Sequence, residues 1–203
     1  MSMDNKWTTI PDMNILEKTM ASLKENGIEA VIVGNGKEAK AKVFELLPEG
    51  AQVMTMTSVT LDAIGVTEEI NESGKYKSVR HEFEKVDDTE KRHLGAAPDW
   101  AIGSVHGVTE DGHVLIASAT GSQLPAYAYG ANHLIWVVGA QKIVKDFDQG
   151  LKRLYEHTLP LESERAHKAY GVPGSFVSKL LVINKEIKPG RITLIIVKEV
   201  LGF

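Results

Sequence analysis

The sequence predicts an α/β fold built on a mixed, mostly parallel sheet that is flanked by helices. Short apolar runs alternate with longer runs whose apolar residues recur at helical spacing, which is typical of parallel strands joined by helical crossovers. The run 133–138 is strongly apolar after its first residue, His133, as expected for an inner strand buried on both faces. Asp111-Gly112 between two apolar runs predicts a hairpin. With 203 residues, of which 43% are hydrophobic, the chain is expected to form one domain over residues 1–203.

Capping and breaking residues set the bounds of the predicted elements. Asp12 is a plausible N-cap for a helix over about residues 12–26, and Gly and Pro residues end several later elements. Further helices are expected at 37–47, 58–64, 67–72, 87–100, 124–129, 146–157 and 162–170. Strands are expected at 28–33, 51–57 and 79–83, in two hairpin runs within 101–123, and at 133–138. The last two strands, within 179–199, are expected to form an antiparallel pair.

Composition excludes several classes of function. A net charge of -4 argues against binding to nucleic acid or to an anionic membrane surface. The absence of cysteine excludes disulfides, thiolate metal sites and an iron–sulfur cluster carried by this chain. No apolar run is long enough for a membrane helix, and residues 1–11 lack a signal-peptide core, so a cytoplasmic location is expected. Gly34-Asn35-Gly36 lacks the third glycine of a dinucleotide fingerprint; a tight turn is the preferred interpretation, and no cofactor is expected.

The leading candidate for an anion-binding loop consists of Ser118, Thr120, Gly121, Ser122 and Gln123. These residues lie where a strand is expected to end and a helix to begin near Gly121. The N–H groups of a first helical turn carry partial positive charge, the hydroxyls add donors, and glycine lets a ligand approach the backbone. The alternative is a plain N-cap by Thr120 or Ser122.

His106 and Glu110 are the candidate catalytic residues. Their even spacing on the first hairpin strand places both on one face. His106 is then a candidate general base, and Glu110 orients it or acts alone. A three-residue turn puts His106 on the same face as Ser118, whereas a two-residue turn puts them on opposite faces. The alternatives are an ordinary hairpin and a metal site completed by His113 and Asp111. We rank the metal site last because tight hairpin tips rarely bring four ligands to one ion.

Two further segments carry candidate ligand-binding residues. Gln141 and Lys142 follow the inner strand at its carboxyl end, which faces the ligand crevice in open α/β sheets. Lys142 is expected to neutralise an anion or, if desolvated, to form a Schiff base, with an ordinary surface lysine as the alternative. Arg165 is expected to hold a carboxylate or phosphate as a bidentate donor. The alternative for Arg165 is an i,i+3 ion pair with Glu162.

Five segments in order resemble the LUD-domain family, the lactate-utilisation family. They are GSVHGVTEDG (103–112), SATGSQ (118–123), GAQKIV (139–144), LPLESER (159–165) and GRITLIIVKEVLGF (190–203). The resemblance spans about residues 15–203 and implies a fold similar to that of sugar-phosphate isomerases and coenzyme A transferases. Some relatives are subunits of a lactate-oxidising complex, and a larger relative carries iron–sulfur modules. This chain resembles the short, cysteine-free form.

Three functions fit these residues, and whether the chain is an enzyme stays open. The first is binding of a small anionic metabolite, such as a 2-hydroxy acid, a sugar phosphate or a coenzyme A derivative, with a link to lactate utilisation. The second is a non-catalytic subunit that docks on an iron–sulfur redox partner. The third is a metal-dependent hydrolase. A homodimer is expected from the aromatic residues Tyr127, Tyr129 and Trp136.

Overall fold

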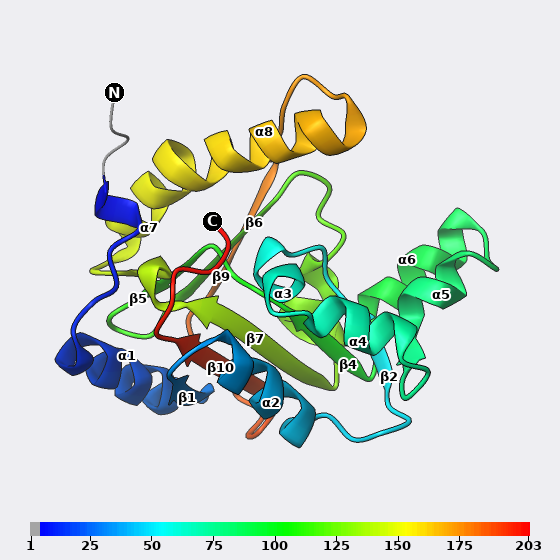
Figure 1. Cartoon of the computed structure of the whole chain (residues 1–203), viewed down its shortest axis with the longest axis horizontal. Coiled ribbons are helices and arrows are strands. Elements are labelled where there is room, and N and C mark those ends of the chain that lie inside the picture. Colours follow the sequence, from blue (N-terminus) through cyan, green and yellow to red (C-terminus); the bar gives the residue numbers. More distant parts are fainter. Residues whose placement is uncertain (1–4) are drawn as a thin grey trace.

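The computed structural model describes residues 5–203 and contains two sheets (Figure 1). A six-stranded sheet is entirely parallel, in the order β1-β10-β7-β4-β2-β3. A four-stranded sheet, in the order β8-β5-β6-β9, combines parallel and antiparallel pairs. The strands are β1 (Glu29–Val33), β2 (Gln52–Thr55), β3 (Lys77–Ser78), β4 (Trp100–Gly103), β5 (Gly107–Thr109), β6 (Val114–Ser118), β7 (His133–Gly139), β8 (Ile143–Val144), β9 (Lys179–Ile183) and β10 (Ile192–Val197). The predicted α/β class is confirmed, but the mixed pairing is confined to the second sheet.

Both faces of the parallel sheet are covered. The helices are α1 (Met13–Glu25), α2 (Gly36–Leu46), α3 (Val59–Ala63), α4 (Val66–Glu72), α5 (Val79–Phe83), α6 (Asp88–Ala96), α7 (Phe147–Arg153) and α8 (Leu159–Tyr170). Shorter helical segments are η1 (Asn5–Trp7), η2 (Ala126–Gly130), η3 (Ala140–Lys142) and η4 (Leu154–Thr158). One face packs against α2, α3 and α4, and the other against α1 and the second sheet. In Figure 1, α8 lies across the top, with the C-terminus between α8 and α3. None of the described helices is long and apolar enough to span a membrane.

β7 is the central strand that the apolar run predicted, because it pairs with β10 on one side and β4 on the other. Its side chains alternate between the two core clusters: Leu134 and Trp136 face α1 and the second sheet, while Ile135 and Val137 face α2 to α4. Trp136 is fully buried and packs edge-on against Tyr127, with ring centroids 5.4 Å apart. Apolar side chains are therefore needed on both faces of this strand from Leu134 to Val138.

The hairpin forms with the three-residue turn, so His106 and Ser118 share a face. Val108 pairs with Val114, and the Thr109 N–H donates to the His113 carbonyl at 2.9 Å. Gly112 supplies a positive φ of 84° within the turn. The first hairpin run is shorter than expected, because β4 belongs to the parallel sheet and only β5 pairs with β6.

One predicted strand and one predicted strand pairing are wrong. Residues 79–83 form helix α5 because Val79 and Phe83 stand four residues apart, a spacing that places both on the face toward the core. The predicted antiparallel pair within 179–199 does not form. Instead β9 pairs with β6, and β10 is inserted between β1 and β7 in the parallel sheet. Residues 192–197 are mostly apolar on both faces, which suits an inner parallel strand rather than a hairpin arm.

Candidate functional site

A cavity of about 1430 Å³ lies where β2, β4 and β7 end. Ligands of open α/β sheets bind at this carboxyl edge. Side chains from the segments that follow these strands line the cavity, and α5, α6, α8 and residues 171–177 contribute further walls. Eight of the predicted site residues line it: His106, Ser118, Thr120, Gly121, Ser122, Gln123, Lys142 and Arg165.

Lys142 is a buried amine at the cavity wall. It ends η3, the turn that directly follows the central strand β7, and only 3% of its surface is exposed. Its Nζ donates to Thr60 Oγ1 of α3 and to Ser104 Oγ after β4, both at 3.1 Å. Burial, and to a smaller degree the nearby charge of Arg153, lowers the pKa of Lys142 from 10.5 to about 7. The amine is therefore a mixture of charged and neutral forms near neutral pH.

His106 lines the cavity and has Nε2 as its hydrogen-bond donor. Its Nδ1 accepts the N–H of Ala117 at 3.1 Å, so the proton of the neutral ring resides on Nε2. Burial, followed by the charges of Lys142 and Arg153, lowers the pKa of His106 to about 3. The ring stays neutral at physiological pH and offers Nε2–H to a ligand.

Arg153 stands behind His106 and is fully buried. Its Nη1 donates to the His106 carbonyl at 2.8 Å and to Thr158 Oγ1 at 2.9 Å, while Nε and Nη2 have no hydrogen-bond partner. Burial lowers the pKa of Arg153 to about 10. No ion pair to a carboxylate is formed by Arg153 or Lys142 in the described part of the chain. Neither cation is paired with a carboxylate among residues 5–203, although Asp62 and Glu162 also line the cavity and Glu162 is bound to Arg165.

The loop from Ser118 to Gln123 lines the cavity, but two of its backbone N–H groups already have partners within the loop. The Gly121 N–H donates to Ser118 Oγ at 2.8 Å, and the Ser122 N–H donates to Thr120 Oγ1 at 3.3 Å. Ser118 Oγ in turn donates to Gln123 Oε1 at 2.9 Å. The expected helix start near Gly121 is wrong, because helical residues begin only at 124. Side-chain oxygens of this loop therefore accept the N–H groups of Gly121 and Ser122, which the sequence analysis expected to bind an anion.

Arg165 lines the cavity as one half of an ion pair. Its Nε and Nη2 each donate to a carboxylate oxygen of Glu162 at 2.7 Å, and its guanidinium lies 5.5 Å from the ring centroid of Tyr170. The hydrogen bond to Glu162 raises the pKa of Arg165 above its ordinary value. The structure thus forms the i,i+3 pair that was the alternative for Arg165, and a ligand would have to compete with Glu162 for the guanidinium.

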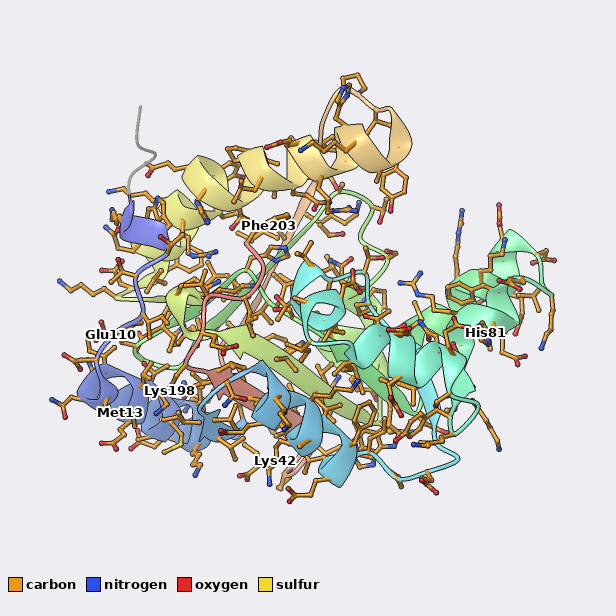
Figure 2. The ribbon with its side chains drawn as sticks, viewed as in Figure 1. Met13, Lys42, His81, Glu110, Lys198 and Phe203 are labelled. Atoms are coloured by element: carbon orange, nitrogen blue, oxygen red, sulfur yellow. The ribbon has the colours of Figure 1, made fainter. Side chains whose placement is uncertain are left out.

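Glu110 and Gln141 lie outside the cavity. The Glu110 carboxylate accepts from Lys18 Nζ of α1 at 2.9 Å, and Figure 2 shows Glu110 beside α1, whereas Phe203, which lines the cavity, lies beneath α8. The Gln141 amide binds the C-terminal segment, since Nε2 donates to the Leu201 carbonyl at 2.9 Å and Oε1 accepts the Leu201 N–H at 3.3 Å. Both side chains therefore make their hydrogen bonds away from the cavity.

The metal site proposed at the hairpin tip is not assembled. Within residues 5–203, no three His, Asp or Glu side chains are placed to hold one metal ion. His113 instead lies 3.9 Å from Asp111, and the Glu110 carboxylate is taken by Lys18.

The polar side chains that the sequence analysis missed include Thr60, Arg80 and Ser104, which line the cavity, and Arg153, which lies behind His106. Arg80 was hidden by the assignment of 79–83 as a strand; it lines the cavity and donates to the Thr55 carbonyl at 2.8 Å. For Arg153 the sequence held one signal: Gly150 lies three residues earlier in the same helix, and a glycine there is consistent with a helix that packs closely against its neighbour. A Cβ at Gly150 would lie 2.8 Å from the Leu115 side chain. Gly150 and Arg153 are the buried residues of α7, so the face of α7 that packs against Leu115 also carries Arg153 into the interior.

Comparisons with known proteins agree with this fold. A family model described as LUD domain matches residues 16–197. Among solved structures, the chain is similar to the crystal structure of a DUF162 family protein from Deinococcus radiodurans, with a TM-score of 0.57 and 13% identity over 93% of this chain and 99% of that chain. At this identity the likeness concerns the fold. A comparison with curated proteins finds no match.

Proposed function

We propose that this chain, which belongs to the LUD-domain family, binds a small anionic metabolite in the cavity beside Lys142. One observation carries the proposal: Lys142 and Arg153 are both buried, the charge of Arg153 acts on Lys142, and neither side chain has a carboxylate partner among the described residues. An unpaired buried cation costs several kcal/mol of folding free energy. Perturbed groups of this kind in a cleft are candidates for function. A negatively charged ligand would supply the missing counter-charge.

The donor set suits a small 2-hydroxy acid. A carboxylate can accept hydrogen bonds from Lys142 Nζ and from His106 Nε2–H, both on residues that line the cavity. The hydroxyls of Ser104 and Thr60, each 3.1 Å from Lys142 Nζ, can exchange hydrogen bonds with a ligand hydroxyl. This chemistry supports the link to lactate utilisation that the family resemblance implies.

Titration of anions into the protein tests the proposal. Calorimetry with L-lactate, sulfate and phosphate is compared with lactamide, a neutral analogue of lactate. We expect at least one anion to bind, lactamide not to bind, and Lys142→Met to lose the binding. Lys145→Met is the matched control, because Lys145 is exposed and lies three residues away. The proposal is wrong if no anion binds the wild type more tightly than it binds Lys142→Met.

The alternative function, docking on an iron–sulfur redox partner, is favoured by exposed apolar side chains at the cavity wall. Tyr170 and Phe176 are 65% and 63% exposed, and both line the cavity. Gel filtration with purified iron–sulfur subunits from the same organism tests this role. A docking role predicts a complex that Phe176→Ser weakens and Lys142→Met leaves intact. The expected homodimer would have to use Tyr129, since Tyr127 and Trp136 are buried in the core.

A further inference from the structure

We infer that Lys142 is a nucleophile that forms an imine with the carbonyl carbon of a small 2-oxo acid. This inference rests on the proposed anion site and adds a covalent role to it. The placement of Lys142 supports it: the amine is buried at the wall of a cavity large enough for a metabolite, and its Nζ contacts the two hydroxyls of Thr60 and Ser104.

A residue that only holds an anion need not be a lysine in this environment. Arginine keeps its charge at all physiological pH values and binds carboxylates with two parallel hydrogen bonds. Lys142 instead has a pKa of about 7, because it is buried and because the charge of Arg153 disfavours a second cation. A desolvated lysine beside another cationic group is a recognised arrangement for activating an amine as a nucleophile. A substantial fraction of Lys142 therefore carries the free electron pair that attack on a carbonyl requires.

The hydroxyl groups beside Nζ can serve the proton transfers. In the first step the Lys142 nitrogen forms a bond to the carbonyl carbon, and one amine proton passes to the former carbonyl oxygen, giving a carbinolamine. In the second step the carbon–oxygen bond breaks, the oxygen leaves as water with a second proton, and a carbon–nitrogen double bond forms. Thr60 and Ser104 lie 3.1 Å from Nζ and can relay these protons. The balance is one carbonyl and one amine giving one imine and one water, with no oxidant or reductant.

The ligand carboxylate explains why a 2-oxo acid is favoured over a simple aldehyde. Protonation of the imine creates a cation at a buried position, which is costly unless an anion lies beside it. In a 2-oxo acid the carboxylate is attached to the reacting carbon and supplies that anion. His106 Nε2–H, on the cavity wall, is available to hold the same carboxylate.

Reductive trapping tests the inference. The wild-type protein is incubated at neutral pH with glyoxylate or pyruvate and cyanoborohydride, and adducts are located by intact mass and peptide mapping. We expect Lys142 to be modified before any other lysine. An ordinary exposed lysine, with a pKa of about 10.4, is neutral in only about one molecule in 2,500 at pH 7. Lys142→Arg should lose the fast adduct, and Lys145→Arg should keep it. Peptide mapping of the wild type gives the result even if Lys142→Arg does not fold.

The outcomes separate this inference from the proposed function. If pyruvate binds in calorimetry but no adduct forms on Lys142 with either probe, the imine is refuted and the anion site stands. If no anion binds and no adduct forms, both proposals are refuted. If acetaldehyde labels Lys142 as fast as glyoxylate does, the assignment to 2-oxo acids is refuted.

Discussion

Replacing Lys142 by methionine should stabilise the free protein at low pH. Lys142 is 3% exposed and contacts two neutral hydroxyls rather than a carboxylate. Its pKa falls from 10.5 to about 7 on folding, mainly through burial. A tenfold change in an equilibrium corresponds to about 1.4 kcal/mol, so the buried charge lowers the free energy of unfolding by on the order of 5 kcal/mol. Methionine has a similar shape and carries no charge.

The size of the effect depends on pH with a definite sign. Below about pH 7 the lysine is protonated in both the folded and the unfolded chain, and the folded state bears the whole cost of the buried charge. Between about pH 7 and 10.5 the folded chain has released the proton while the unfolded chain still holds it. The free energy of unfolding of the wild type therefore gains about 1.4 kcal/mol per pH unit from this residue. The advantage of Lys142→Met should shrink across this window and vanish above it.

Urea unfolding from about pH 6 to about pH 10, in buffers without polyanions, measures this dependence. The quantity to plot is the difference in free energy of unfolding between Lys142→Met and the wild type. Methionine cannot form the hydrogen bonds to Thr60 and Ser104, and this loss lowers the free energy of unfolding of Lys142→Met by about 1 kcal/mol at every pH. The change of the difference with pH is therefore more informative than its absolute value. Lys145→Met, which removes an exposed lysine, should show a flat difference. A flat difference for Lys142→Met as well would refute the buried-charge argument.

Two further substitutions test the core and the loop. Trp136→Ala should lower the free energy of unfolding by about 3–5 kcal/mol, because it leaves a cavity at a fully buried position of the central strand. A loss below about 1 kcal/mol in urea unfolding would contradict the assigned packing. Gly121→Val should cost about 1–3 kcal/mol, because φ is +88° there and a Cβ would lie 2.6 Å from the Lys179 side chain. Ala119→Val, at a neighbouring position without a positive φ, is the control. An equal effect of both valines on the melting temperature would show that backbone strain at Gly121 is absent.

Local features of the chain were predictable because their causes lie within a few residues. The Asp12 carboxylate caps α1 by accepting the Ile15 N–H at 3.0 Å, as its position before an amphipathic run predicted. The apolar run of β7 indicated burial on both faces, and the structure confirms it. The carboxyl end of that strand also indicated Lys142 as a residue facing a crevice. These predictions required only periodicity, capping and the general architecture of α/β sheets.

The tertiary structure decided which candidate residues meet. Thr60 and Ser104 lie 82 and 38 residues from Lys142 along the chain, and they meet its amine because β4 and β7 are neighbours in the sheet and α3 packs at their carboxyl ends. Glu110 lies away from the cavity and binds Lys18, a residue of α1 that is 92 positions distant in the sequence. No local pattern encodes such pairings, because they depend on strand order, and strand order follows from how complete apolar faces pack together.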